Sequence, residues 1–576
     1  MSCKRISKQI LSVLFLLLLA SSVSIAREKF SNSAKMIDSY FKRLESFGLS
    51  GSLLIGDKNR VLFKENYGIK NSRKDFDYAY SVGSVTKQFT ASAILLLEQR
   101  GLLNTNDKIS AHLTGVPEDK SDITIHQLLT HTSGLMDGYW DRNRNLSEEQ
   151  YIKKILAGKL DSAPGSRHSY VNPGYHLLKK IIEIVSNKSY EKFLVEDIFK
   201  PNNLNRTGFR LVKWNKDQVV KYSDWTMSES KIKDLAYPLK RPVYLQPEGS
   251  GGLLSTTNDL YKWYQLIFNS NKLLTTNSKT KLLKTEKNNY AYGWNVTETS
   301  RNTKLISHGA YDSWLGTVTG FYNFADEDLV VIFLGNTNMS QFLRKEDLMR
   351  DIETIVFGGS VELPPESSHK ASQRELDLVL GSYGRNGKTT NIAKGKIDNQ
   401  IRLRTKDQNL IKHLLFPKLS ESKKLTDFQL EFFVDQINKN DFAPLKGTYL
   451  RSATFEGAKA QYSGVWKNLV SNYGKYKELR VLHMLPSTYE GKFELQFFTE
   501  FIFEKGSFYA RMFRFTDGSV QVQPLSFPKK LEIYLIPKNK NEFITWNIKT
   551  GTSSTIQING NELVVNGNDQ MTFLKQ

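Results

Sequence analysis

Cysteine is almost absent from this sequence. Only Cys3 occurs among 576 residues, which excludes a disulfide scaffold, a cysteine-based zinc site and an iron–sulfur cluster. Proline and glycine, with 15 and 37 residues and no repeat, exclude a collagen-like chain. The hydrophobic content of 39% is sufficient to form sizeable cores, so general disorder is excluded as well. The length predicts about two to four domains.

Acidic residues are outnumbered by basic ones. The chain has 59 Asp and Glu against 80 Lys and Arg, which gives a net charge of +21. This excess is spread along the chain with acidic residues interleaved, and no segment forms a dense basic block. We therefore expect no nucleic-acid partner, and a basic surface that leaves contact with an anionic cell envelope open.

Long apolar runs are also missing, except for one near the N-terminus. Residues 10–20 (ILSVLFLLLLA) follow a short basic segment and precede small residues at Ser24 and Ala26. This layout predicts a secretory signal peptide over residues 1–26. The run is shorter than the roughly 20 residues of a membrane span, so an uncleaved anchor is only the alternative. We expect an exported protein, periplasmic or secreted, with no integral membrane span after signal removal.

The rest of the chain divides by pattern into a mixed part and a β-rich part. Residues 27–358 begin and end with strand patterns and have helical patterns between them, which predicts one sheet built from both ends. Residues 359–373 contain Pro-Pro and a serine run and are typical of a linker. Residues 374–576 carry short alternating runs and Asn-Gly turns, which predict an all-β barrel or sandwich.

One Ser-x-x-Lys motif differs from the others by its context. Ser84 and Lys87 are three residues apart, which on a helix places both side chains on one face. A partly desolvated, neutral lysine can take the proton of a serine hydroxyl. Ser84 opens the most apolar helical pattern of the chain after the predicted signal peptide. The same spacing recurs in polar stretches at Ser228/Lys231, Ser278/Lys281 and Ser420/Lys423.

Further segments follow this motif in a characteristic order. They are LLTHTSGL at 128–135, Tyr170-Val171-Asn172, Tyr292-Gly293-Trp294 and Ser307-His308-Gly309-Ala310. Together they make the chain resemble the serine β-lactamase-like hydrolases, which include class C β-lactamases, penicillin-binding proteins, and related esterases and D-aminopeptidases. The resemblance covers about residues 35–345. It implies an α+β fold, an antiparallel sheet flanked by helices plus a helical subdomain, with the site between them.

The resemblance also implies a role for each matching residue. Ser84 would be the acylated nucleophile, Lys87 the partner that takes or shares its proton, and Tyr170 the relay to the leaving group. Asn172 would hydrogen-bond the substrate amide and Lys87. The backbone N–H groups of Ser84 and Tyr311 would form the oxyanion hole. No metal and no organic cofactor is expected.

The third motif departs from the family pattern. His308-Gly309-Ala310 stands where β-lactamases and carboxypeptidases carry Lys-Thr-Gly. A histidine is mostly neutral at pH 7, so His308 offers less charge to a substrate carboxylate, and the Ala310 methyl narrows the approach along the strand. Both residues are still expected to contact substrate. We interpret His131 of the HTSGL segment as structural, because its spacing from His126 does not match a zinc-binding pair.

The sequence therefore predicts a serine hydrolase that forms an acyl-serine intermediate with a small-molecule or peptide substrate. Peptidoglycan D-Ala peptides or β-lactams are the expected amides or esters, as for a carboxypeptidase or β-lactamase. Two alternatives stay open. One is a small-substrate esterase or D-aminopeptidase, which the His308 variant favours. The other is an envelope-binding protein without turnover, against which the intact Ser84, Lys87 and Tyr170 argue.

Overall fold

The computed structural model describes most of the chain in two compact units. The described residues are 31–69, 76–137, 146–220, 248–312, 317–336, 345–369, 371–394, 401–416, 427–445, 455–486, 493–515, 520–524, 531–547, 552–566 and 570–576. One unit, here the sheet unit, comprises Gly48–Lys345 and Ser420–Ser526; the other, the barrel unit, comprises Met1–Phe47, Glu346–Leu419 and Phe527–Gln576. The predicted signal peptide lies outside the described residues. The predicted domain boundaries, which assumed contiguous segments, stay a prediction.

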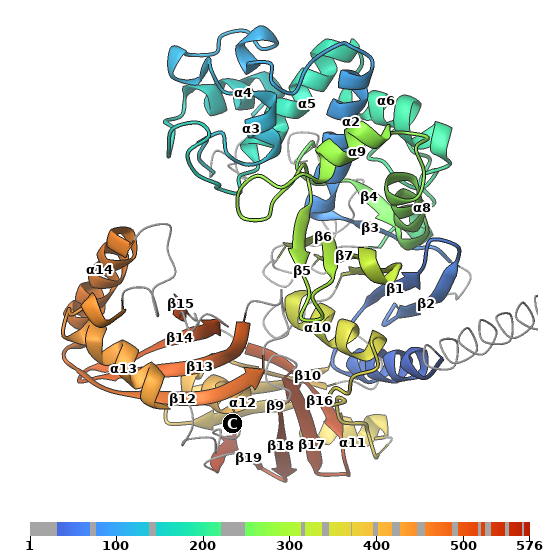
Figure 1. Ribbon diagram of the computed structural model, residues 1–576. Coiled ribbons are helices and arrows are strands. Elements are labelled where there is room, and N and C mark those ends of the chain that lie inside the picture. Colours follow the sequence, from blue (N-terminus) through green and yellow to red (C-terminus); the bar gives the residue numbers. More distant parts are fainter. Residues whose placement is uncertain are drawn as a thin grey trace, which may run out of the picture. The chain divides into compact units, whose positions relative to one another are not determined.

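A six-stranded antiparallel sheet in the order β2-β1-β8-β7-β6-β5 forms the centre of the sheet unit (Figure 1). Its strands are β1 (Gly51–Gly56), β2 (Val61–Tyr67), β5 (Asn295–Glu298), β6 (Lys304–Asp312), β7 (Thr317–Phe324) and β8 (Leu329–Gly335). β1 pairs with both β2 and β8, so strands from the two ends of the mixed part share one sheet, as the pattern predicts. All residues of β7 and β8 are buried, and the nearly continuous apolar sequence of β8 fits this burial.

Helices form the second part of this unit. They are α2 (Thr86–Gln99), α3 (Ile125–Leu129), α4 (Glu148–Ala157), α5 (Pro173–Ser186), α6 (Tyr190–Phe193), α8 (Thr257–Phe268) and α9 (Thr276–Leu283). α2 is buried from Thr86 to Leu97, because it packs against α5 and contributes to one large apolar core. Figure 1 shows α2 to α6 gathered in one helical region, with α8 beside the sheet. The predicted fold, a sheet with flanking helices and a helical subdomain, is confirmed.

A smaller group of helices and strands with a core of its own belongs to the same unit. α13 (Asp427–Asn438) and α14 (Phe455–Tyr473) share a core with the four-stranded sheet of β12 (Tyr476–Pro486), β13 (Phe493–Phe503), β14 (Gly506–Phe515) and β15 (Val520–Pro524). The sequence analysis predicted an all-β region here and did not predict these helices. Phe433, Val434 and Ile437 carry the helical signal, since their i, i+1, i+4 spacing buries one face of α13.

A closed barrel of eight strands dominates the barrel unit and confirms the barrel among the two predicted forms, barrel or sandwich. Its order is β10-β11-β16-β17-β18-β19-β20-β9. The strands are β9 (Gly381–Arg385), β10 (Lys388–Lys394), β11 (Ile401–Thr405), β16 (Leu531–Pro537), β17 (Glu542–Asn547), β18 (Thr552–Asn559), β19 (Glu562–Asn566) and β20 (Met571–Lys575). α12 (Gln408–Leu415) packs against β17 and β18.

Three further helices belong to the barrel unit: residues 31–46, α10 (Lys345–Val356) and α11 (Gln373–Val379). The first is joined to α10 by the Tyr40 hydroxyl, which donates to Asp351 Oδ2 at 2.6 Å. Between α10 and α11, residues 359–369 form no helix or strand. Within the described ranges, no helix is long and apolar enough to cross a membrane.

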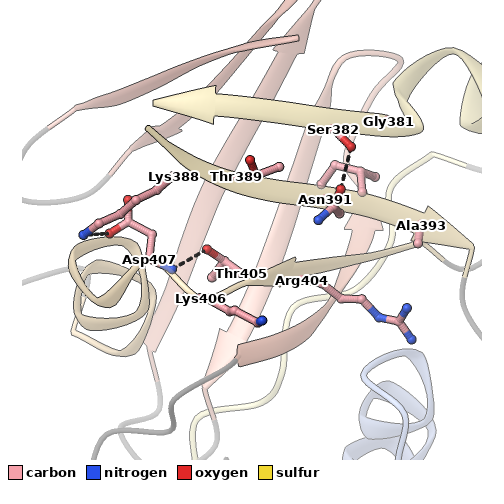
Figure 2. Close-up of a pocket in the computed structure, with 11 residues that line it drawn as sticks. Gly381, Ser382, Lys388, Thr389, Asn391, Ala393, Arg404, Thr405, Lys406 and Asp407 are labelled. Atoms are coloured by element: carbon pink, nitrogen blue, oxygen red, sulfur yellow. Dashed lines mark hydrogen bonds and ion pairs between the residues drawn. The ribbon is translucent and has the colours of Figure 1, made fainter. Parts of the chain in front are cut away.

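A pocket of about 860 Å³ lies beside β9, β10 and β11 (Figure 2). Two pairs of the polar side chains that line it interact with each other. Lys388 Nζ lies 3.4 Å from Asp407 Oδ1, and the Ser382 hydroxyl donates to Asn391 Oδ1 at 2.6 Å. Asp407 also caps the N-terminus of α12 by accepting from the Asn409 N–H. Its lining residues thus stabilise the barrel wall.

Candidate active site

Ser84 lies in a 3-10 turn, Gly83–Val85, that leads directly into α2. Gly83 has φ +52°, a left-handed conformation that glycine adopts without a steric penalty. A Cβ on Gly83 would come within 2.5 Å of the Ala310 Cβ. The Ser84 turn therefore lies against β6, and the Ala310 methyl group fills the space beside Gly83.

Lys87 is fully buried one turn into α2. Its Nζ lies 3.2 Å from Ser84 Oγ, 2.8 Å from Asn172 Oδ1 and 2.8 Å from the Ser250 carbonyl oxygen. Burial lowers the pKa of Lys87 to about 7, and the negative charge of Asp137 partly opposes this shift. The lysine is therefore close to half neutral near pH 7.

The hydrogen-bond partners of Lys87 suit its neutral form. The Asn172 amide oxygen and the Ser250 carbonyl oxygen can only accept hydrogen bonds, whereas the Ser84 hydroxyl can also donate. A neutral amine has two N–H donors and one lone pair. It can thus donate to both acceptors and receive the proton of Ser84, which is the geometry of a general base.

Asn172 directs its side chain at Lys87 instead of capping its own helix. It occupies the N-cap position of α5, with Pro173 at the first helical position, yet its side chain makes no capping hydrogen bond. Its backbone carbonyl accepts from Tyr175 N at 3.0 Å. The N-terminus of α5 therefore fixes the Asn172 backbone and leaves the amide oxygen for Lys87.

Tyr170 places its ring beside the lysine. Lys87 Nζ lies 4.8 Å from the Tyr170 ring centroid, a cation–π distance. The residue exposes 40% of its surface, but its hydroxyl end lies at Ser84. There, desolvation raises the pKa of Tyr170, and a hydrogen bond with the Ser84 side chain acts in the opposite direction. Tyr170 is thus protonated at neutral pH and can pass a proton on rather than act as a resting phenolate.

His308 lies on β6 and is 3% exposed. Its Nδ1 lies 3.1 Å from the Gly309 carbonyl oxygen and its Nε2 lies 3.3 Å from the Tyr290 hydroxyl oxygen. Because a carbonyl only accepts, Nδ1 carries the proton in neutral His308, and Nε2 accepts from Tyr290. Both ring nitrogens therefore have partners within the protein.

The structure brings most of the predicted site residues together. Ser84, Lys87 and Asn172 are linked by hydrogen bonds, and Tyr170 contacts Lys87 through its ring. The rings of His308 and Tyr170 lie 6.3 Å apart. Tyr311 follows Ala310 on β6 and pairs with Val318 of β7.

Ser250 and Tyr290 at this site were missed by the sequence analysis, and Gly293 was named only as part of a motif, without a role. The Ser250 carbonyl contacts Lys87, and its hydroxyl lies 3.2 Å from His176 Nε2. Gly293 has φ +75°, and a Cβ there would lie 2.8 Å from the Lys87 carbonyl oxygen. Tyr290 contacts His308. Gly293 was visible as a motif residue, whereas a backbone carbonyl such as that of Ser250 leaves no residue-type signal.

Comparisons with known proteins bear on the family of this chain. A family model described as Beta-lactamase matches residues 45–354. Penicillin-binding protein 4* of Bacillus subtilis (strain 168) is 25% identical over 381 residues, which cover 61% of this chain and 83% of that protein. Protein flp of Staphylococcus aureus (strain N315) is 29% identical over 330 residues, 51% of this chain, and the match spans only 60% of flp. The solved octameric penicillin-binding protein homologue from Pyrococcus abyssi is 17% identical, with a TM-score of 0.48, over 94% of this chain and 99% of that one. Because the family model covers more than half of the sequence, this chain belongs to the Beta-lactamase family.

Proposed function

We propose that this protein is an exported serine hydrolase that works through an acyl-Ser84 intermediate. The observation that carries the proposal is the environment of Lys87. Its amine lies 3.2 Å from Ser84 Oγ, has two partners that can only accept, and has a pKa lowered to about 7 by burial. In this environment Lys87 can accept a proton from Ser84 near neutral pH, as a general base does.

Acylation would proceed by nucleophilic attack. Ser84 Oγ bonds to the substrate carbonyl carbon while its proton moves to the Lys87 amine. The negative charge that develops on the carbonyl oxygen would be stabilised by the backbone N–H groups of Ser84 and Tyr311. When the bond to the leaving group breaks, Tyr170 donates its hydroxyl proton to that group and recovers a proton from Lys87.

Deacylation would reverse these proton transfers. A water molecule attacks the acyl carbon and loses a proton to the Tyr170–Lys87 pair. The same pair then returns a proton to Ser84 Oγ as the acyl–oxygen bond breaks. Asn172 would hold Lys87 in place through both steps and present its amide N–H to the substrate.

Amides or esters of the peptidoglycan D-Ala or β-lactam type are the substrates proposed first. His308 favours a second candidate, a small-substrate esterase or D-aminopeptidase. Its ring nitrogens bond to Tyr290 and Gly309, so neutral His308 adds no cation for a substrate carboxylate at this position. An envelope-binding protein without turnover is the third possibility.

A substrate panel separates these candidates. Wild type and Ser84→Ala are assayed side by side on p-nitrophenyl esters, nitrocefin and a D-Ala-D-Ala peptide. Loss of every activity in Ser84→Ala supports the nucleophile, and hydrolysis of esters alone would rule out the lactamase and carboxypeptidase functions. Mass spectrometry after a fluorophosphonate should find the adduct on Ser84. No adduct and no turnover would support the binding protein.

Export is tested separately. The proposal that residues 1–26 are a cleaved signal predicts that the secreted or periplasmic protein begins at Arg27, which N-terminal sequencing would show. A chain that keeps Met1 and fractionates with membranes would support an uncleaved anchor instead.

A further inference from the structure

We propose that His131 is a positioning residue that holds Tyr170 in the orientation needed for proton relay. The inference rests on the proposed function of Tyr170. It assigns to the histidine of the HTSGL segment a part in the chemistry that goes beyond packing.

His131 accepts hydrogen bonds from the residues on both sides of Tyr170. The Ser169 backbone N–H donates to the His131 carbonyl oxygen at 2.8 Å. The Val171 backbone N–H donates to His131 Nδ1 at 3.2 Å. The His131 and Tyr170 ring centroids lie only 4.3 Å apart, with the planes tilted by 39°. One residue therefore fixes the backbone before and after Tyr170 as well as one face of its ring.

The backbone of His131 is unusual in a way that serves these contacts. Its φ is +57°, in the left-handed region, which costs a non-glycine residue on the order of 1 kcal/mol or more. In this conformation its carbonyl oxygen and its ring nitrogen both reach the segment 169–171. The turn is closed by Thr132 N, which donates to the Gln127 carbonyl oxygen at 2.9 Å.

His131 adds no charge to the site. It is 1% exposed, and burial, together with the positive charge that neighbouring Lys87, His168 or His308 would carry when protonated, holds its pKa well below the usual value. With Nδ1 accepting from Val171, the proton of the neutral ring sits on Nε2. Among the described residues this Nε2 has no hydrogen-bond partner. His131 thus does not compete for the proton that Lys87 and Tyr170 exchange.

Aromatic rings surround the His131 ring, whose Nε2 has no hydrogen-bond partner among the described residues. The His131 ring lies against Tyr175 and Tyr290 as well as Tyr170, with centroids 5.1 Å and 4.8 Å away for the first two. The faces of such rings are weak acceptors for an N–H group. The ring of His131 is thereby held on several sides, and Tyr170 is held with it.

The ratio of acylation rates for two leaving groups is a readout that a purely structural residue would not change. A p-nitrophenolate leaves as an anion, whereas an alkoxide or an amine leaves only with a proton. Misplacing Tyr170 should therefore slow acylation by an alkyl ester or amide much more than by a p-nitrophenyl ester of the same acyl group. A general loss of folded enzyme would lower both rates by one common factor.

The test compares His131→Ala, His131→Asn and His131→Gln, with Tyr170→Phe as the reference. We expect both His131→Ala and Tyr170→Phe to lose at least about tenfold more kcat/KM on the alkyl ester than on the p-nitrophenyl ester. Asn tolerates positive φ and its Oδ1 can replace Nδ1, so His131→Asn should recover most of the loss. Gln places its acceptor one bond further out and should not. The comparison of Asn with Gln remains decisive if the alanine variant does not fold.

Two results would overturn the inference. One is an equal loss on both esters in His131→Ala or His131→Gln, and the other is wild-type selectivity in all three variants. The proposed function fails by a different result, since Ser84→Ala would then keep its activity on both esters.

Discussion

Lys87 and Lys120 are both buried lysines, but their partners differ. Lys120 Nζ lies 2.6 Å from the Asp119 carboxylate, which compensates the buried charge. The hydrogen-bond partners of Lys87 are a hydroxyl, an amide and a backbone carbonyl, none of which carries a charge. Lys87, beside Ser84, is therefore the buried lysine without a charged hydrogen-bond partner. The free-energy cost of burying its charged form favours the neutral amine, which is the form that can act as a base.

The pH dependence of acylation should report this lysine. Because neutral Lys87 takes the proton of Ser84, kcat/KM is expected to rise with pH and level off above a midpoint near 7. Asn172→Asp would place a carboxylate where the amide oxygen now lies, 2.8 Å from Nζ, and favour the charged lysine. The midpoint should then move up by about one pH unit or more. Asn172→Ala is the control, and an unchanged midpoint in Asn172→Asp would contradict Lys87 as the base.

Stability should depend on pH through the same group. The pKa of Lys87 is about 7 in the folded protein and 10.5 for an ordinary lysine, so between these values the unfolded chain binds more protons. The free energy of unfolding therefore rises with pH in this window, by up to about 1.4 kcal/mol per pH unit. Lys87→Met lacks this contribution. Denaturant unfolding at pH 7, 8, 9 and 10 should show its stability falling relative to wild type, and a constant difference would refute the shift.

At the scale of elements, the contact between the Ser84 turn and β6 is a tight constraint. A Cβ at Gly83 would clash with Ala310, and φ +52° adds strain of about 1–2 kcal/mol for any other residue. We expect Gly83→Ala to lower both the melting temperature and the acylation rate. Ala310→Gly removes the clash but not the strain, so the double variant should recover only part of each loss. Ala310→Gly alone is the control; full recovery in the double variant would mean that the strain is negligible.

The elements that position the site were largely predictable, because their burial is visible as local patterns of apolar residues in the sequence. α2 and β8 carry apolar runs that reflect burial on all sides, and Ser84 and Lys87 are related by local helical spacing. Ser250 was not predictable, since its carbonyl contact with Lys87 joins segments 163 residues apart. Tyr290 was not predictable either, because its contact with His308, 18 residues away, follows no helix or strand period. The left-handed turn at His131 was not predictable either, because no glycine or asparagine marks it.

At the scale of the whole molecule, the two units interleave along the chain. β11 and β16 are neighbours in the barrel, with Thr405 paired to Leu531, while the segment between them includes α13, α14 and β12 to β15 of the sheet unit. Composition and turn patterns do not reveal such an insertion, because the inserted strands resemble those of the barrel. The boundaries of one contiguous β-rich domain over residues 374–576 stay a prediction.

Each unit has its own stabilising contacts, so they should respond separately to mutation. Glu532 is buried in the barrel between Arg402 at 2.7 Å and Arg404 at 2.6 Å. Removing Glu532 leaves the charges of both arginines without their carboxylate partner, which destabilises the barrel. Glu532→Leu should lower the calorimetric transition of the barrel unit and leave kcat unchanged, since every described contact of Ser84 and Lys87 is within the sheet unit. Glu532→Gln is the milder control, and a parallel fall in kcat would show that the units are coupled.

The separation of β11 from β16 also sets a delay during synthesis. Roughly 125 residues are added between them, which takes about 6 to 25 seconds at about 5–20 residues per second. For that time the edge of β11 has no partner strand, although Ile401 and Leu403 are already made. An unpaired edge with apolar side chains invites pairing with other chains. The nascent chain is therefore prone to aggregation during this time, whereas the closed barrel is not.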